Sequence, residues 1–232
     1  MLIDQIQNRD CVEGMRELPD ESVDCVVTDC PYEIVRHGST GCGGMLSNNN
    51  PNALNGKIFE HNDIDFDEYL PELYRVLKQD THCYIMINAR NLKNLQVAAE
   101  KAGFKFQNLL VWRKNTATPN KFYMQTLEFI LMLRKGRERW VNDMGVTNCL
   151  SVPNIIGKTN HPTEKPIALM RVMVEQSTKR GDLVLDPFMG AGSTALACVQ
   201  SERHFVGFEI DKKYHAIAER RLAGESRQLT LF

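Results

Sequence analysis

The stretch Leu183-Val184-Leu185-Asp186-Pro187-Phe188-Met189-Gly190-Ala191-Gly192-Ser193-Thr194 decides the fold. Its apolar start predicts a strand, and the two glycines predict a tight turn that opens a helix. Glycines there let the backbone approach a ligand closely, and the first helical turn offers N–H groups that have no partner inside the helix. The stretch has neither a Gly-x-Gly-x-x-Gly nor a Gly-Lys-Ser/Thr pattern, so dinucleotide and Walker-type sites are weakly supported. It therefore predicts an α/β protein with a ligand site where a strand meets a helix.

Two acidic residues beside this turn indicate the ligand. Asp186 ends the strand, and in Gly207-Phe208-Glu209 a second carboxylate ends the next strand. An acid before the turn suits an ammonium group, and an acid at the end of the next strand accepts hydrogen bonds from ribose hydroxyls in nucleoside-binding α/β folds. An ammonium and a ribose together describe S-adenosylmethionine. Each acid alone could be only a helix cap, but the two together favour this cofactor.

A second informative strand, residues 22–28, runs into the tetrad Asp29-Cys30-Pro31-Tyr32. Alternating and then β-branched residues predict the strand, which ends at the tetrad because proline cannot donate to a ladder. The tetrad brings a carboxylate, backbone carbonyls and an aromatic ring to the mouth of a sheet. That grouping suits a flat aromatic substrate that carries an amino group. We therefore predict Asp29, Cys30, Pro31 and Tyr32 as the catalytic residues.

The rest of the chain alternates strands with helices, which predicts a doubly wound, mainly parallel sheet in one domain over residues 1–224. Gly224 is expected to end the last helix. A glycine- and asparagine-rich stretch, residues 35–57, is interpreted as a mobile substrate loop rather than a passive insertion. Residues 134–160 lack clear periodicity and are the candidate for a short target-recognition insertion. The predicted strands are 2–9, 83–87, 104–112, 127–133, 183–185 and 204–208, and the predicted helices are 11–18, 65–77, 92–102, 167–178, 191–199 and 212–222.

The charge of the chain is unevenly placed, although its net value of -1 argues against a generally basic nucleic-acid binder. Residues 1–80 carry 16 acidic and 6 basic side chains, whereas residues 101–140 carry 9 basic and 2 acidic ones. Such segregation is what a polyanion-binding face needs, although solvated charge runs are also common. The predicted phosphate contacts are Arg113, Lys114, Arg134, Lys135, Arg137 and Arg139.

The seven cysteines are scattered and form no Cys-x-x-Cys pair, so neither a zinc site nor a thioredoxin motif is supported. Without a recognisable signal peptide, they are interpreted as reduced thiols in a cytoplasm. No apolar run approaches the roughly 18 residues that a membrane-spanning helix needs.

Taken together, these motifs resemble the amino-methyltransferases of DNA in their permuted, beta-type order. In that order an Asp-Pro-Pro-Tyr-like catalytic motif precedes an Asp-Pro-Phe-x-Gly-x-Gly-Thr cofactor motif. The resemblance covers most of the chain, and His161-Pro162-Thr163-Glu164-Lys165-Pro166 ahead of the glycine turn is especially specific to this group. It implies a Rossmann-like methyltransferase fold, S-adenosylmethionine as the cofactor and double-stranded DNA as the partner. The other matching segments are Asp10, 29–32, 111–115, Glu128, 186–194 and 207–209 with Tyr214.

The resemblance also implies roles for single residues. Glu209 would bind the ribose, Asp10 the adenine amine of the cofactor, and Lys165 with the Asp186 turn its methionine end. Cys30 stands where the family usually has proline. The second tetrad residue supplies its backbone carbonyl, which cysteine retains, so the sulfur is expected to be idle. The full cofactor set is Asp10, Lys165, Asp186, Pro187, Phe188, Gly190, Gly192, Ser193, Thr194 and Glu209.

The target base follows from the first tetrad position. Aspartate there is the family's usual choice for adenine N6 and serine for cytosine N4, so we expect N6-adenine, with N4-cytosine as the alternative. The base would flip out of the duplex and stack on Tyr32, while Met45 and Leu46 fill the vacated space. An inactive nucleic-acid-binding regulator and a protein-glutamine methyltransferase are the other classes considered. The intact Asp29 and glycine turn disfavour both.

Residues 225–232 are interpreted as a tail peptide. Its last five residues, Gln228-Leu229-Thr230-Leu231-Phe232, resemble the bacterial sliding-clamp-binding peptide, Gln-Leu-x-Leu-Phe. Gln228 would anchor by side-chain hydrogen bonds, and Leu229, Leu231 and Phe232 would supply the apolar contacts. The alternative is an apolar segment that folds back on the core. A clamp partner implies a bacterial nucleoid or a phage-infected cell, and a homodimer is a further partner that the sequence leaves open.

Overall fold

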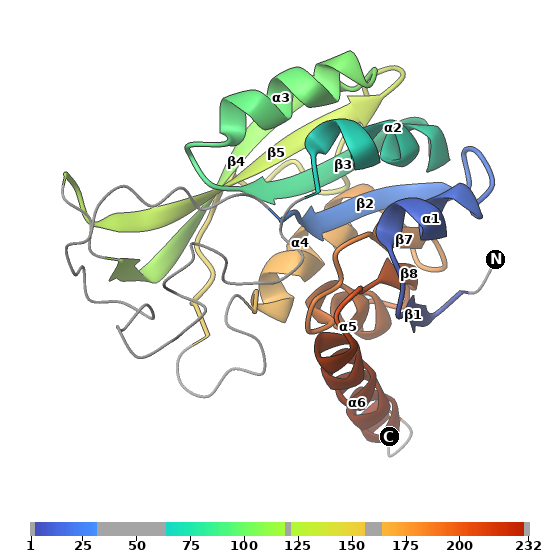
Figure 1. Ribbon diagram of the computed structural model, residues 1–232. Helices are drawn as coiled ribbons and strands as arrows, with labels where there is room; N and C mark the ends of the chain where they lie inside the picture. The colour runs from blue at the N-terminus through green and yellow to red at the C-terminus, as the bar shows by residue number, and fades with distance from the viewer. Residues whose placement is uncertain (1–2, 32–63, 119–121, 156–163, 230–232) are drawn as a thin grey trace.

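The computed structural model describes residues 3–31, 64–118, 122–155 and 164–229, with side chains as far as Glu225. Eight strands form one sheet in the order β1-β8-β7-β2-β3-β5-β4-β6, and helices cover both of its faces (Figure 1). The strands are β1 (Gln5–Gln7), β2 (Val23–Asp29), β3 (Leu77–Ile87), β4 (Lys105–Thr118), β5 (Gln125–Lys135), β6 (Cys149–Leu150), β7 (Leu183–Asp186) and β8 (His204–Phe208). The helices are α1 (Cys11–Arg16), α2 (Phe66–Val76), α3 (Leu92–Lys101), α4 (Ile167–Ser177), α5 (Ser193–Gln200) and α6 (Lys212–Leu229).

The sheet is mainly parallel, as predicted. Among the described strands only β5 runs against its neighbours, pairing antiparallel with β3 on one side and β4 on the other. The predicted strands 83–87 and 104–112, with helix 92–102 between them, are present as parts of β3, β4 and α3. Strands β3 and β4 are parallel but not adjacent, because the fully buried Ile130, Leu131 and Leu133 of β5 lie between them.

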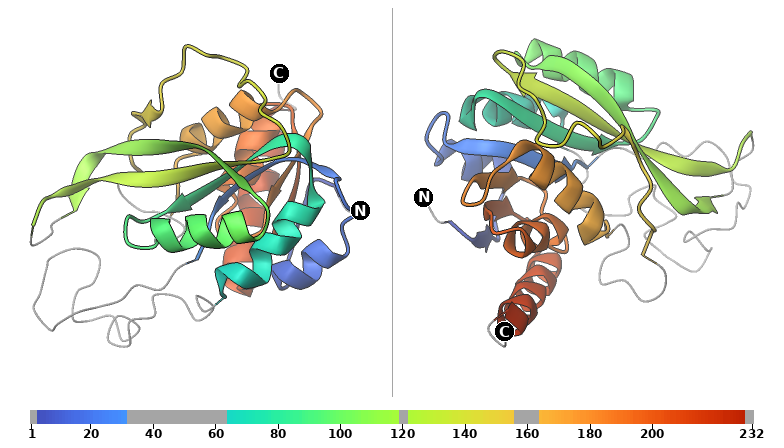
Figure 2. Two further views of the ribbon diagram at one scale, coloured as in Figure 1. Left: turned by 90° about the horizontal axis from the view of Figure 1, so that it is seen from above. Right: turned by 180° about the vertical axis from the view of Figure 1, so that it is seen from behind.

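The helices divide into two layers, which Figure 2 shows from above and from behind. Helices α1, α2 and α3 cover one face of the sheet, and their buried residues join one apolar cluster that includes Met15, Leu73 and Leu95. Helices α4, α5 and α6 cover the other face through a second cluster that includes Met173, Ala197 and Ala218. Apolar side chains on both faces of each central strand are what make the parallel part a buried sheet.

The order of the strands changes direction between β2 and β7. From β2 the chain crosses through α2 to β3 on one side, and from β7 it crosses through α5 to β8 on the other side. In open α/β sheets, ligands bind at the carboxyl ends of the strands where the order reverses in this way. The two motifs that carried the sequence analysis, after Asp29 and after Asp186, meet at this switch point.

Strands β4 and β5 are longer than predicted. Pairing between β3 and β5 stops at Ile87 and Phe129, while pairing between β4 and β5 continues to Thr118 and Gln125. The two strands thus project past the sheet as a ribbon, drawn in green at the left of Figure 1. Residues 113–126 show no alternation of apolar and polar side chains from which a strand could have been predicted.

Local signals set most helix boundaries as expected. Asp65 begins α2 with a capping box in which its backbone N–H donates to Glu68 Oε1 at 2.9 Å. Gly103 follows α3 with a φ of +107°, a conformation that favours glycine. The exception is Gly224, because α6 runs through it to Leu229 instead of ending there. Within the described residues, no helix is long and apolar enough to cross a membrane.

Two glycines give a matched test of this packing. A Cβ at Gly14 would lie 2.3 Å from a ring carbon of Phe208, whereas a Cβ at Gly224 would have no atom within 4 Å. Gly14→Ala should lower the free energy of unfolding by about 1–3 kcal/mol because it overpacks the contact of α1 with β8. Gly224→Ala should raise it by about 0.5–1 kcal/mol because alanine is the better helix former. Urea denaturation measures both, and a destabilised Gly224→Ala would contradict a helix through that position.

Candidate active site

The end of β2 places a carboxylate at the switch point. Asp29 closes the strand, and its Oδ2 accepts a hydrogen bond from Lys165 Nζ. The Asp29 side chain is 24 % exposed and that of Lys165 is 9 % exposed. The ion pair is therefore partly buried but still reachable from the edge of the sheet. Breaking such a partly buried pair leaves one charge without compensation, which costs several kcal/mol. Lys165 therefore fixes both the charge and the position of Asp29.

A second carboxylate extends this pair into a chain of four charges. Glu128 Oε2 lies 3.7 Å from Lys165 Nζ, and Glu128 Oε1 accepts a hydrogen bond of 2.9 Å from Lys114 Nζ. The order is Asp29, Lys165, Glu128, Lys114. The sequence analysis noted Glu128 as part of the resemblance but did not predict it as a site residue. A lone acidic residue inside the apolar strand 127–133 was the signal that could have found it.

The two carboxyl groups of this chain differ in their pKa. Burial raises the pKa of Asp29, and the nearby Lys165 only partly opposes that effect. Burial also acts on Glu128, but Lys165 and Lys114 together outweigh it and lower the pKa of that carboxyl group. Asp29 is therefore the better proton acceptor of the two.

Cys30 is buried with its thiol directed away from the open edge. Its Sγ donates to the Met86 carbonyl of β3 at 3.4 Å, and the residue is 2 % exposed. Burial raises the pKa of the thiol to about 12, so it carries no reactive thiolate at neutral pH. This agrees with the expectation that the sulfur is idle. Tyr32, the last residue of the tetrad, lies outside the described residues.

The cofactor motif forms a glycine turn between β7 and α5. Gly190 and Gly192 have φ values of +55° and +84°, which glycine adopts without strain. Asp186 is 2 % exposed, and its Oδ1 accepts hydrogen bonds from Thr28 Oγ1 at 2.6 Å and from the Phe188 N–H at 3.0 Å. It therefore holds the turn to β2, while its charge remains close to the switch point.

The other predicted cofactor residues fall into two groups. Glu209 lies beside the turn, where its oxygens accept the N–H groups of Gly190 and Asp211, each at 2.8 Å. Asp10 is the N-cap of α1 and accepts the Glu13 N–H at 3.0 Å. Both are partly exposed at the ends of adjacent strands. The remaining motif residues are buried and shape the turn, namely Pro187, Gly192, Ser193 and Thr194, whereas Phe188 and Gly190 are partly exposed.

One short segment joins the two halves of the site. Glu164 forms a buried ion pair of 2.7 Å with Arg221 of α6, and Arg221 also donates to the Ala191 carbonyl in the glycine turn. The next residue, Lys165, holds Asp29. The resemblance predicts Lys165 at the methionine end of the cofactor, and in the structure its Nζ pairs with Asp29. His161, Pro162 and Thr163 lie outside the described residues.

The predicted phosphate contacts do not lie together. Arg113 and Lys114 belong to the edge that carries Asp29. Lys135 pairs with Thr81 and Arg134 with His82, at the opposite end of β3, so the structure does not bring the cluster 134–139 to the site. Arg134 instead donates to the Gly136 carbonyl, Arg137 pairs with Asp80 at 2.8 Å, and Arg139 lies beside His82.

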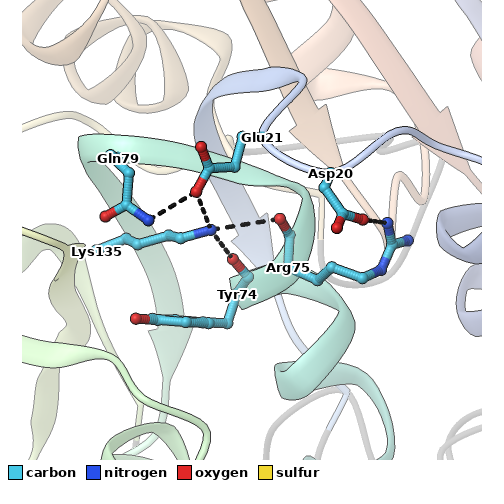
Figure 3. A pocket seen from close by; sticks show the side chains of 6 residues that line it. All are labelled: Asp20, Glu21, Tyr74, Arg75, Gln79 and Lys135. Atoms are coloured by element: carbon cyan, nitrogen blue, oxygen red, sulfur yellow. Dashed lines mark hydrogen bonds and ion pairs between the residues drawn. The ribbon is translucent and has the colours of Figure 1, made fainter.

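Lys135 has a clear structural role, which Figure 3 shows. Its Nζ donates to the carbonyls of Tyr74 and Leu77 at 2.8 Å each, and it lies 3.3 Å from Glu21 Oε1. A cation there satisfies the last carbonyls of α2 and complements the helix dipole. The residue is 4 % exposed, so a contact with DNA phosphate is not supported.

The described part of the predicted target-recognition insertion, residues 134–155, does not lie at one place: its early and late residues are at opposite edges of the sheet. Asn142 donates to the carbonyls of Glu175 and Thr178 at the carboxyl end of α4, on the edge away from Asp29. Only the later part turns towards the site, where Val152 accepts the Trp112 indole N–H at 2.7 Å and the Asn154 N–H donates to Asn115. The substrate loop 35–57 lies outside the described residues.

Comparison with known proteins defines the class to which this fold and site belong. A family model described as DNA methylase, for N6 and N4 methyltransferases, matches residues 23–220. The chain therefore belongs to the S-adenosylmethionine-dependent DNA methyltransferases of that family.

Individual relatives are similar along nearly their whole length. YubD of Escherichia coli (strain K12) is 29% identical over 232 residues, 95% of this chain and 90% of that protein. The type II methyltransferase M2.DpnII of Streptococcus pneumoniae is 27% identical over 238 residues, 94% of this chain and 88% of that one. The crystal structure of the M1.HpyAVI–SAM complex has a TM-score of 0.69 at 27% identity and covers 94% of this chain and 98% of its own. PvuII DNA methyltransferase, which is cytosine-N4-specific, shares the fold with a TM-score of 0.72 at 17% identity over 94% of this chain and 85% of that one.

The residues of the glycine turn fit S-adenosylmethionine. Two left-handed glycines expose backbone at the start of α5, and three carboxylates (Asp10, Asp186 and Glu209) lie at the ends of β1, β7 and β8. Partly exposed carboxylates suit ribose hydroxyls and an amine, and the buried charge of Asp186 suits an ammonium group.

The pH dependence of cofactor binding tests this arrangement. Burial raises the pKa of Asp186 to about 6. Below that pH the group is neutral, and above it the group is an anion that attracts a bound ammonium. The affinity for S-adenosylmethionine should therefore rise by about tenfold as the pH rises from about 5 to about 7.5. Asp186→Asn should bind more weakly at the higher pH and should lose the dependence. Calorimetric titration measures both, and an unchanged pH profile in Asp186→Asn would contradict the assignment.

Proposed function

We propose that the protein methylates the exocyclic N6 amine of an adenine that is flipped out of double-stranded DNA. The observation that carries this proposal is the Asp29 carboxylate at the switch point, held by Lys165 beside the glycine turn. An aspartate in that position, by the resemblance described above, is the usual choice for adenine. Cytosine N4 is the second candidate because PvuII DNA methyltransferase, which shares the fold, is cytosine-N4-specific.

The amine must first become a nucleophile, because its lone pair is conjugated with the ring. Asp29 Oδ1 accepts one N–H of the amine, and the Cys30 carbonyl accepts the other. These two bonds favour a pyramidal nitrogen whose lone pair is directed away from the base. Positioning and electrostatics of this kind carry transfers that need no covalent adduct. The bound cofactor supplies an electrophilic methyl group on a sulfonium.

Lys165 and Glu128 prepare Asp29 for this role. Lys165 occupies Oδ2 and so leaves Oδ1 for the amine. Because burial raises the pKa of Asp29, its carboxylate accepts the proton that the amine loses more readily than an ordinary aspartate would. Glu128 also interacts with Lys165, and its negative charge opposes the lowering of the Asp29 pKa by Lys165.

The duplex must open before the base reaches Asp29. Flipping a nucleotide costs a few kcal/mol of unstacking. In the proposal, Tyr32 offsets part of this cost by stacking on the base, and Met45 and Leu46 fill the space that the base leaves. Arg113, exposed on the same edge as Asp29, is the phosphate contact retained from the predicted set, because Lys114 is mostly buried and paired with Glu128.

Two variants on one strand test the chemistry. Asp29→Ala should lower the rate of methyl transfer by at least about 100-fold, because it removes one acceptor of the amine, and should leave cofactor affinity largely unchanged. Asp24→Asn is the control, since Asp24 lies at the other end of β2 and pairs with Lys78 at 2.7 Å. Mass analysis of nucleosides from treated DNA gives the product. N4-methylcytosine without N6-methyladenine would select the cytosine alternative, and tight cofactor binding without any transfer would favour a regulator.

We also propose that residues 228–232 bind the bacterial sliding clamp. Support comes from the sequence Gln228-Leu229-Thr230-Leu231-Phe232, whose first two residues are the last two of α6. Short peptides with a few apolar anchors bind grooves in this manner.

Deletion of residues 228–232 should abolish pull-down by purified clamp and leave methylation of short duplexes unchanged, because the deleted residues are outside the site. Clamp binding that survives the deletion would exclude the peptide as the contact.

A further inference from the structure

The ribbon that projects from the sheet presents apolar side chains to solvent. We name it the β4–β5 arm and define it as residues 113–118 and 122–127. Near its end, Phe122 and Tyr123 are each 85% exposed, and Met124 is 59% exposed. Leu127, closer to the sheet, is 44% exposed. Exposed apolar groups gathered on one projecting element mark a contact surface rather than scattered surface residues.

The arm rises from the edge of the sheet that carries the catalytic carboxylate. Asp29 pairs with Met86, and Met86 pairs with Ile130, so two strand spacings, about 10 Å, separate Asp29 from β5. The arm begins three residues from Ile130, at Leu127, and leads away from the sheet. Six extended residues, 113–118, reach about 20 Å. Figures 1 and 2 both show this ribbon standing clear of the helical layers.

The charge of the arm selects its partner. The arm contains Arg113 and Lys114 and no aspartate or glutamate, in a chain whose net charge is -1. The nearest acid, Glu128, is already paired with Lys114 and Lys165. Two copies of such an arm would repel each other, whereas a polyanion would attract it. Aromatic side chains beside cations are also the combination that contacts bases and phosphates together.

From this geometry we propose that the β4–β5 arm enters the major groove of the DNA, with Phe122 and Tyr123 against the bases and Arg113 on a flanking phosphate. The inference deepens the proposed function and rests on it. A major groove about 12 Å wide admits a two-stranded β-ribbon. The proposal moves target contact from the predicted insertion 134–160, whose early part lies at the edge away from Asp29, to an element that starts beside the active site.

The chain offers a matched control for the test. Trp140 is 80% exposed, as the arm aromatics are, but follows Arg139 on the edge away from Asp29. The double variant Phe122→Ala with Tyr123→Ala should weaken binding to duplex DNA roughly 10- to 100-fold, because the apolar contacts of both rings with base edges are lost. Trp140→Ala should bind DNA as the unaltered protein does. Both should keep the same thermal unfolding temperature and the same affinity for S-adenosylmethionine.

Fluorescence anisotropy with labelled duplex of mixed sequence measures the affinity at several salt concentrations. Arg113→Ala should reduce the slope of log affinity against log salt by about one, because one phosphate contact is lost. If the unaltered protein binds and methylates DNA but the double variant binds equally well, the arm is not the contact and the proposed function still stands. If the unaltered protein neither binds nor methylates DNA, the proposed function itself fails. A loss of dimer mass in the double variant, with DNA affinity unchanged, would assign the arm to self-association and overturn the proposal.

Discussion

The ion pair between Asp29 and Lys165 is the interaction on which the site depends. A carboxylate near the centre of a sheet is costly to bury unless a cation and hydrogen bonds compensate it. Lys165 supplies that compensation for Asp29, Glu128 compensates Lys165, and Lys114 compensates Glu128. The result is an alternating row of charges across β2 and the β4–β5 pair. Each member is held by its neighbours, so the Asp29 carboxyl group has a fixed place in the structure.

Glu164 and Lys165 connect the glycine turn to Asp29. Adjacent residues of an extended chain point in opposite directions, and Glu164 and Lys165 use that property to hold two different elements. Glu164 forms an ion pair with Arg221, which donates to the Ala191 carbonyl of the glycine turn, while Lys165 forms an ion pair with Asp29. The two motifs lie far apart in the sequence, yet they form one site because β7 lies against β2.

Much of this arrangement could be predicted from the sequence, and the failures have physical reasons. Strands β2, β7 and β8 and the glycine turn carry local signals, namely apolar runs and glycines, so their placement needed no tertiary information. The position of β5 depended on which strands pair, which no local pattern states. Basic residues 134–139 are close to Arg113 in sequence, but an antiparallel strand carries them to the opposite edge. Lys135 in particular was predicted as a surface cation, although its ammonium group donates hydrogen bonds to the carbonyls at the end of α2.

The single reversed strand has a consequence for how proteins of this shape can change. Because β5 runs against its neighbours, the end of β4 and the start of β5 lie together, beyond the last residues that β3 pairs with. Residues added to or removed from these two strand ends alter how far the ribbon projects from the sheet. The buried part of β5, from Ile130 to Leu133, is left as it was. Evolution can therefore vary the length of the ribbon and the chemistry of the site independently, since the first depends on the projecting ends of β4 and β5 and the second on a row of partly buried charges.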